Sequence, residues 1–366
     1  MTKIDLLGSG EDDVAAEAPA TANTVHSVTQ ALMHAGFEPV PTPATRAGAP
    51  PRPSSADPNE THIGRFVAGR ELGRGGMGRV VEGYDPELLR TVALKLVLHD
   101  ASPNQARLAR FVAEAQITAQ LDHPNIVPVH ELGVTAGGEL FIAMKRVEGR
   151  SLRQVIDGLN AGDPFLNQLY SPFFLMMRFG LVCGAMAHAH ERGVLHRDLK
   201  PDNVMLGDFG EVMVMDWGVA RVMGDLSEQV RVEPLEDMPL AHTMDGSSIG
   251  TPGYMSPEQA RGKLAELDAR SDVWSLGTML FEMLTLKRAY EAPNAYAALL
   301  RTLGEPPPDP REVAPERGID DEIAEVILRA MDRDPAKRFD NAIMLAQAVG
   351  QYMESGRHGQ DRCDED

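Results

Sequence analysis

The sequence has little cysteine and no excess of basic residues, and both scarcities narrow what the protein can be. Only two cysteines, Cys183 and Cys363, occur in 366 residues. A structural disulfide or a cysteine-based metal site is therefore not expected. So few cysteines favour a protein that works in a reducing compartment. Lys and Arg number 35 against 54 Asp and Glu, which gives a net charge of −19. So acidic a chain is a poor match for nucleic acid or an anionic membrane as its main partner.

Long apolar runs are also missing. The most apolar stretch, residues 172–189, is interrupted by Arg178 and favours a buried helix over a membrane span. At the start of the sequence, Lys3 and Asp5 flank only a short apolar piece, which does not fit a secretion signal. A cytoplasmic location is therefore expected.

What the sequence does contain is enough apolar material for one large domain. Hydrophobic residues make up 43% and charged residues 24%, an ordinary composition for a globular protein. Residues 1–62 are rich in proline and are expected to be disordered, because they can bury too little apolar surface. We expect a folded domain over residues 63–352, with a small lobe at about 63–147 and a larger one at about 148–352. The acidic tail, 353–366, is expected to be disordered.

Hydrophobic periodicity predicts a β-rich region followed by a helical one. We expect strands at residues 66–72, 79–84, 91–97 and 140–147. We expect helices at residues 105–120, 173–192, 271–285, 321–331 and 342–353. This order predicts an α+β fold with a small β-rich lobe, containing one main helix, and a larger helical lobe.

A glycine-rich run follows the first expected strand. Residues 73–80 fit the pattern G-x-G-x-x-G-x-V, and glycine lets a backbone approach phosphate oxygens closely. Dinucleotide-binding folds use a similar pattern, but there the third glycine opens a helix, whereas residues 80–84 here continue as a strand. No Gly-Lys-Ser/Thr follows, which excludes a Walker-type loop. A hairpin without a ligand remains the alternative for this run alone.

The most informative stretch is His196-Arg197-Asp198-Leu199-Lys200-Pro201-Asp202-Asn203, followed by Asp216-Trp217-Gly218. It puts a carboxylate, an ammonium and an amide on one short loop. The second carboxylate comes far enough along for a tight β-hairpin in between. Phosphoryl transfer needs these groups, because one must accept a proton from the attacking hydroxyl, one must neutralise the moving phosphoryl, and two must bind magnesium.

These motifs, with Val92-Ala93-Leu94-Lys95, resemble those of bacterial eukaryotic-like (Hanks-type) serine/threonine protein kinases. The resemblance covers residues 63–352 and implies a two-lobed protein kinase fold with ATP between the lobes. The implied reaction in bacterial signalling is Mg²⁺-dependent transfer of the ATP γ-phosphoryl group to Ser or Thr hydroxyls of proteins, with Mn²⁺ as an alternative ion. Protein substrates are implied, and self-association would allow one copy to phosphorylate another.

The resemblance also implies a role for each motif residue. Asp198 would be the catalytic base, and Lys200 would stabilise charge on the γ-phosphate. Lys95 would hold the α- and β-phosphates and pair with Glu114 on the helix that follows. The metal ligands would be Asn203 and Asp216, with Trp217 where the family usually has Phe.

The remaining nucleotide contacts are expected from the glycine-rich run, two strands and the segment between the lobes. Met144 would be the gatekeeper, and the backbone of Lys145 and Val147 would bond the purine edge. Ala93, Val80 and Met205 would sandwich the ring. The full set beside Lys95 comprises Leu72, Gly73, Arg74, Gly75, Gly76, Met77, Gly78, Arg79, Val80, Ala93, Met144, Lys145, Val147 and Met205.

A second triplet, Asp208-Phe209-Gly210, spells the family's usual metal motif. It follows Asn203 too closely to allow a strand, a turn and a returning strand in between. We therefore expect it to form the turn between strands at residues 204–206 and 211–215. Trp217 is expected to pack between the lobes, where its indole N–H needs a hydrogen-bond partner.

Further residues are expected to hold the domain together or to regulate it. Glu258 should pair with Arg338, and Asp272 should steady the backbone of the catalytic loop. Arg197 precedes the catalytic aspartate, and in kinases with that arginine a phosphate on the activation loop often organises the site. The candidate phosphosites are Thr243, Ser247 and Ser248, with an ordinary exposed loop as an equal alternative.

Two other functions stay open on the sequence. A pseudokinase that only docks partners usually lacks one of the residues Lys95, Asp198 or Asp216, which are all present here. A small-molecule phosphotransferase is disfavoured by residues 251–258, because that segment receives a peptide in protein kinases. The sequence does not identify the substrate, although Asp202 beside the catalytic groove could favour basic side chains near the acceptor.

Overall fold

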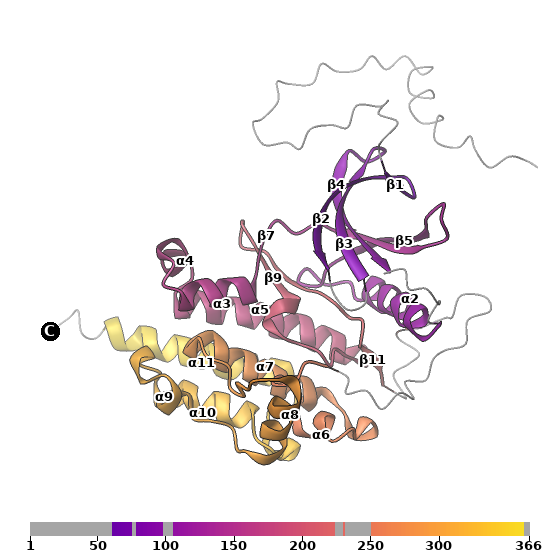
Figure 1. Ribbon diagram of the computed structural model, residues 1–366. Coiled ribbons are helices and arrows are strands. Elements are labelled where there is room, and N and C mark those ends of the chain that lie inside the picture. Colours follow the sequence, from indigo (N-terminus) through magenta and orange to yellow (C-terminus); the bar gives the residue numbers. More distant parts are fainter. Residues whose placement is uncertain (1–60, 75–77, 98–104, 224–229, 231–249, 362–366) are drawn as a thin grey trace, which may run out of the picture. The chain divides into compact units, whose positions relative to one another are not determined.

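A computed structural model describes residues 61–74, 78–97, 105–223, 230 and 250–361. In this part of the chain a β-rich N-lobe, residues 61–147, precedes a helical C-lobe that begins at residue 148. Figure 1 shows the sheet of the N-lobe and the helices of the C-lobe as two separate layers of structure. The expected two-lobed α+β protein kinase fold is confirmed.

The N-lobe is built on one antiparallel sheet with the strand order β1-β2-β3-β4-β6-β5. One face of the sheet buries Phe66, Leu94 and Phe141. Helix α2, Gln105–Gln120, packs its buried residues Phe111 and Val112 against β6. The strands are β1 His62–Ile63, β2 Phe66–Arg74, β3 Gly78–Asp85, β4 Arg90–Val97, β5 Val129–Val134 and β6 Leu140–Lys145.

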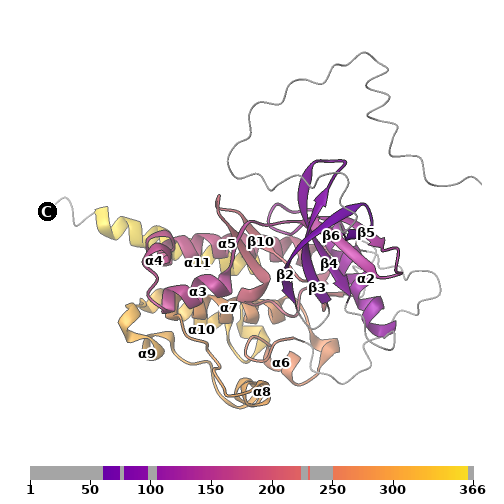
Figure 2. The same ribbon diagram turned by 45° about the horizontal axis from the view of Figure 1, so that its top comes forward.

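The C-lobe is organised around helix α7, Ala269–Thr285. Almost every side chain of α7 is buried, as expected for a helix at the centre of a domain. Asp268 caps its N-terminus by accepting a hydrogen bond from the N–H of Arg270. The surrounding helices, seen in Figures 1 and 2, include α3 Leu152–Asn160, α4 Pro164–Leu169, α5 Pro172–Glu191, α6 Pro257–Ala260, α8 Ala295–Gly304, α9 Pro310–Val313, α10 Asp321–Ala330 and α11 Ala342–Asp361.

Short strands of the C-lobe flank the segment that carries the expected catalytic residues. β9, Val204–Gly207, pairs with both β7, Gly149–Ser151, and β10, Val212–Val214. β8, Val194–Leu195, pairs with β11, Arg221–Val222. The loop between β8 and β9 carries the most informative sequence motif.

Several elements differ from the sequence expectations, and helices α3, α4, α6, α8 and α9 were not among those expected. Regular structure starts at His62 in β1, so the described domain begins slightly before residue 63. Strand β5 was not expected, because its partly exposed sequence VHELGV has no clear alternation. Helix α11 continues to Asp361 instead of ending at Met353. In the extension, Ser355 donates a hydrogen bond to Glu322 of α10, and in the preceding turn Tyr352 donates to Asp320, the residue just before α10.

Among the described helices, α5 is the one whose length and hydropathy would allow it to cross a membrane. This rests on length and composition alone, and half of its most apolar window is buried inside the protein. Its buried residues Leu175, Phe179 and Met186 belong to the main C-lobe core. A core helix of a globular domain gives this pattern.

Candidate functional site

One face of the N-lobe sheet collects several of the expected nucleotide contacts. Directly opposed residues of an antiparallel pair share a face, and the register places Val80 opposite Lys95 and Ala93 opposite Met144. We call this side of the sheet the Lys95 face. Ala93 is buried, while the other three side chains are partly exposed.

The glycine-rich run is described only at its two ends. Gly78 is required there, since a Cβ would lie 2.1 Å from the carbonyl oxygen of Leu96. The side chain of Arg74 does not point freely toward a ligand, because it is paired with Glu71 at 2.9 Å. Leu72 is 40% exposed. The expected contacts Gly75, Gly76 and Met77 lie outside the described residues.

Lys95 joins the two lobes. Its Nζ lies 2.5 Å from Glu114 Oε1 on α2 and 3.1 Å from Asp216 Oδ1 in the C-lobe. The expected ion pair with Glu114 is thus confirmed, and its proximity to Asp216 is new. Burial disfavours the ammonium, but the two carboxylates outweigh it and raise the pKa of Lys95 above its ordinary value.

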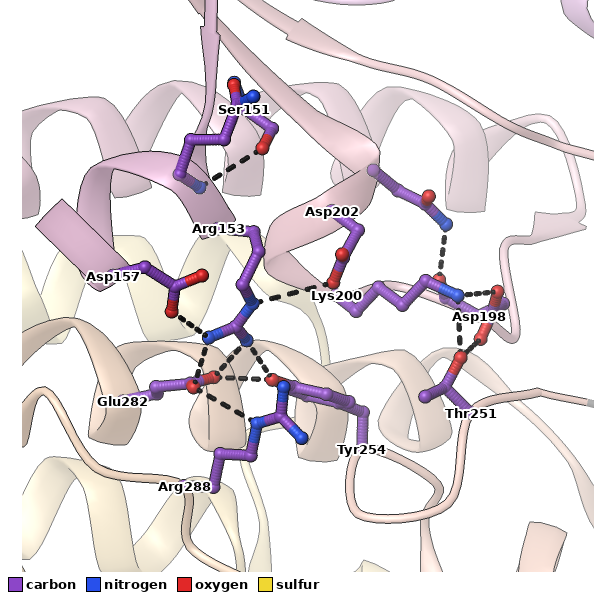
Figure 3. A network of polar contacts seen from close by, with 12 residues as sticks. Ser151, Arg153, Asp157, Asp198, Lys200, Asp202, Thr251, Tyr254, Glu282 and Arg288 are labelled. Atoms are coloured by element: carbon purple, nitrogen blue, oxygen red, sulfur yellow. Dashed lines mark hydrogen bonds and ion pairs between the residues drawn. The ribbon is translucent and has the colours of Figure 1, made fainter. Parts of the chain in front are cut away.

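The catalytic loop brings three polar groups into contact (Figure 3). Lys200 Nζ donates to Asp198 Oδ2 at 2.7 Å and to the Thr251 hydroxyl at 2.6 Å. The same hydroxyl donates to Asp198 Oδ1 at 2.7 Å. A hydroxyl oxygen can therefore sit against the carboxylate with an ammonium beside it, the arrangement needed for proton transfer from an acceptor hydroxyl.

Asp272 on α7 holds the backbone of this loop, as expected. Its carboxylate accepts the N–H groups of His196 and Arg197, each at 2.9 Å, and lies 2.9 Å from the Nε2 of His190. Burial opposes ionisation, but the hydrogen bonds and nearby histidines lower the pKa of Asp272. Arg197 adopts φ +65°, a region that costs energy in a non-glycine residue. Asp272 and the side chain of Gln259, which donates to the Arg197 carbonyl, stabilise this backbone.

Asn203 and Asp216 offer oxygen ligands of the kind that Mg²⁺ prefers. The Asn203 amide nitrogen donates to the Asp198 carbonyl at 2.8 Å, which leaves its Oδ1 as the atom available to a metal. Burial works against the charged form of Asp216, yet Lys95 lowers the pKa of this carboxyl. An amide oxygen and an ionised carboxylate therefore fit a hard divalent cation.

The two candidate metal triplets are clearly separated by the hairpin. Val212 pairs with Leu206, so Asp208-Phe209-Gly210 forms the turn, as expected, and Phe209 is 94% exposed. Trp217, in contrast, is 1% exposed and its ring lies 4.6 Å from that of His196. The expected partner for its indole N–H is missing among the described residues. Its place in the core comes from packing alone.

The segment between the lobes, residues 145–147, was expected to bond the purine edge through the backbone of Lys145 and Val147. One of these backbone groups is already occupied. The N–H of Lys145 already donates to the Pro128 carbonyl at 3.0 Å. A contact from the Lys145 backbone to a purine would therefore use its carbonyl oxygen. Its side chain turns to Glu211 at 2.6 Å. Met205 lies on β9, where it is paired with Met213.

The structure shows the surroundings of two arginines near the activation segment, Arg338 and Arg197. Arg338 makes two hydrogen bonds to Glu258, at 2.8 and 2.9 Å, which confirms the predicted pair. Arg197 has its guanidinium directed to the carbonyls of Val219 and Ala220. Burial and the nearby Arg221 lower the pKa of Arg197 to about 10. The candidate phosphosites Thr243, Ser247 and Ser248 lie outside the described residues.

The sequence reasoning missed a second polar network next to the catalytic loop (Figure 3). Arg153 on α3 donates to Glu282 on α7 at 2.7 and 3.0 Å and to the Tyr254 hydroxyl. Its Nε lies 3.7 Å from Asp202, so the carboxylate expected to attract basic substrate side chains already has an internal cation nearby. Helical spacing predicts that Arg153 and Asp157 are neighbours, but no local signal connects Arg153 to Glu282.

Comparisons with known proteins agree with this geometry. Residues 66–349 match the family model of the protein kinase domain. The chain is 34% identical over 301 residues to the serine/threonine-protein kinase PknD of Chlamydia caviae, which covers 79% of this chain and 31% of the relative. It is 33% identical to PknD of Chlamydia trachomatis, covering 79% and 32%. The chain thus spans about a third of the length of these relatives.

A solved structure supports the fold. The kinase domain of Mycobacterium tuberculosis PknI matches with a TM-score of 0.56 and 24% identity, over 81% of this chain and 99% of that chain. This likeness concerns the fold alone, whereas the family match over residues 66–349 shows that the chain belongs to the protein kinase family.

Proposed function

We propose that the protein is a bacterial serine/threonine protein kinase that transfers the γ-phosphoryl group of ATP to Ser or Thr hydroxyls of other proteins. The observation that carries the proposal is the convergence of Lys95, Glu114 and Asp216 on one side and Asp198 with Lys200 on the other. These groups come from both lobes. An acceptor hydroxyl and a nucleotide phosphate can be brought together between them.

In this proposal the residues act mainly by positioning and by charge stabilisation. Lys95, fixed by Glu114, binds the α- and β-phosphates. Asp198 orients the acceptor hydroxyl and takes its proton. Lys200, which lies within 2.7 Å of Asp198, neutralises charge that develops on the transferred group.

Asn203 and Asp216 are proposed to hold Mg²⁺, with Mn²⁺ as an alternative. The ion would neutralise phosphate charge and orient the γ-phosphoryl group. Asp216-Trp217-Gly218 is therefore proposed as the working metal motif, with Trp in place of Phe. Lys95 lies 3.1 Å from Asp216 and lowers the pKa of this carboxyl, so that it stays ionised, and this supports the assignment.

Further parts of the proposal concern regulation and location. The guanidinium of Arg197 donates to the carbonyl groups of Val219 and Ala220 and forms no ion pair with a carboxylate in the described part of the chain, so its charge remains available to a phosphate on the activation segment. Thr243, Ser247 and Ser248 are the candidates for that phosphate. Autophosphorylation between self-associated copies and a cytoplasmic location are proposed on the sequence grounds given above.

Incubation with labelled ATP and Mg²⁺ tests the function directly. We expect the wild-type protein to phosphorylate itself or a generic protein substrate, and Lys95→Met to abolish the label. Lys263→Met is a suitable control, since it makes the same substitution at a half-exposed lysine of the C-lobe that pairs with Glu266. A wild-type protein that binds MgATP without transferring phosphate would favour the pseudokinase alternative.

A further inference from the structure

A carboxylate that the sequence motifs do not include lies on the Lys95 face. Glu82 follows Val80 by two positions on β3, and side chains alternate along a strand, so both point to the same side. The register puts Glu82 directly opposite Ala93, which in turn lies opposite Met144. Glu82 is therefore next to the residues expected to contact adenine, at the end of the face farther from Lys95.

A carboxylate at this position needs a partner, and the segment between the lobes supplies it. Arg146 Nη1 lies 2.8 Å from Glu82 Oε1. Both side chains are mostly covered, at 16% and 17% exposure. The pair is therefore better shielded from solvent than an ordinary surface ion pair, and its geometry constrains both residues.

Two exposed residues touch the same pair from outside. Arg70 Nε lies 3.2 Å from Glu82 Oε2, but its side chain is 72% exposed. Glu148 Oε1 lies 3.1 Å from Arg146 Nη1 and is 67% exposed. Contacts of this exposure contribute little, so the Glu82–Arg146 contact is the one that can fix the position of the backbone.

We propose that the Glu82–Arg146 ion pair is a positioning device for ATP, an inference that rests on the proposed kinase function. It ties β3 of the N-lobe to the residue between Lys145 and Val147, whose backbone groups are expected to meet the purine edge. The pair thus fixes the distance between the sheet that covers adenine and the backbone that bonds it. Neither residue is among those assigned above to the phosphates or the acceptor hydroxyl, so both are proposed as positioning residues and not catalytic ones.

The proposal predicts an effect limited to the adenine end of the nucleotide. Arg146→Gln should weaken MgATP binding by about three- to tenfold, because the restrained geometry must then be restored on binding. Adenosine should lose about the same factor as MgATP, whereas magnesium tripolyphosphate should bind as tightly as before. The turnover at saturating ATP should change by less than about twofold, which is the pattern expected when uniform binding is lost.

Calorimetric titration of the full chain with MgATP, adenosine and magnesium tripolyphosphate tests this. The matched controls are Arg70→Gln and Glu148→Gln, which remove the exposed contacts to the same two side chains and should leave all three affinities unchanged. The double variant Glu82→Gln with Arg146→Gln should lose little more affinity than Arg146→Gln alone, because the two substitutions remove the same contact. Melting curves without ligand show whether each variant is folded.

Two results would overturn the proposal. One is an Arg146→Gln protein that is folded and binds adenosine as tightly as the wild type. The other is an equal loss of affinity for tripolyphosphate, which would assign the effect to general loosening of the domain. Binding of MgATP by the wild type tests the kinase assignment, whereas the ratio between variants tests the ion pair, so the two failures are distinguishable.

Discussion

The catalytic loop and the segment between the lobes bring polar groups to the same site by different means. The loop is held by buried contacts that act on its backbone, chiefly those from Asp272 to the N–H groups of His196 and Arg197. The segment between the lobes has a backbone hydrogen bond from Lys145 to Pro128, and the side chains of Lys145 and Arg146 add ion pairs to Glu211 and Glu82. Changes to the buried contacts that support the loop should therefore cost a great deal, whereas the other segment can be adjusted in small steps.

The largest expected effect is on the proton-accepting group of the loop. Asp198→Asn should lower turnover by about 10²- to 10⁴-fold, because the amide cannot take up the proton. The fold should be unaffected, since the amide can keep a hydrogen bond to Thr251. Steady-state phosphorylation assays and a melting curve measure both quantities.

Asp202→Asn is the matched control for this prediction. Asp202 lies on the same loop with a 52% exposed side chain and only a 3.7 Å contact to Arg153. Its turnover should stay within about threefold of the wild type, as expected for an exposed contact. Equal losses in both variants would mean that the loop responds to charge and not to a specific base.

The backbone support of the loop comes next in size. Asp272→Ala should destabilise the protein by about 3–5 kcal/mol, because it leaves two buried N–H groups without an acceptor and His190 without its partner. Asp268→Ala, at the cap of the same helix, should cost only about 1 kcal/mol. Urea unfolding of both variants checks the difference, and similar values would show that the loop does not depend on α7.

A smaller effect is expected from acid. Burial opposes ionisation of Glu258, but Arg338 overcomes it and lowers the pKa of Glu258 below its ordinary value. A lowered folded-state pKa means that the stabilisation is complete above the unfolded value of about 4.3 and is lost as the pH falls through the folded value. The free energy of unfolding should therefore decrease below about pH 4.5.

The Glu258→Gln variant isolates this contribution. It should be less stable than the wild type by about 3 kcal/mol at pH 7, since it leaves the buried Arg338 without a carboxylate. Its stability should fall less steeply than that of the wild type between about pH 5 and pH 3. Parallel pH profiles would assign acid unfolding to other carboxylates.

The smallest effect should follow from Trp217→Phe. The indole N–H is buried without a partner in the described part of the chain, so its removal offsets part of the lost packing. We expect a stability change within about 1.5 kcal/mol and little change in metal dependence. A large loss of Mg²⁺-dependent activity would show that the indole itself positions Asp216.

Much of this site could be predicted from the sequence because its motifs are local. Residues 196–203 are contiguous, and the short spacing to Asp208 was enough to assign the hairpin turn and to prefer Asp216. The pair of Lys95 and Glu114 was predicted from the family resemblance, since 19 positions separate the two residues.

The contacts that were missed depend on how distant elements pack. The Thr251 hydroxyl reaches Asp198 across 53 positions, and Arg153 reaches Glu282 across 129. Glu82 was expected only as part of a strand, because nothing in its neighbourhood indicates which residue it will face. Strand β5 was missed for a related reason, since an edge strand with partly exposed side chains has no strong alternation.

The position of Trp217 also gives the protein its own optical reporter. The sequence has two tryptophans, and the second, Trp274, is fully buried in α7. In a Trp274→Phe protein all indole emission would come from Trp217, which follows Asp216 and has its ring 4.6 Å from that of His196. The arrival of a cation or nucleotide at that carboxylate could then be followed by fluorescence in unlabelled protein.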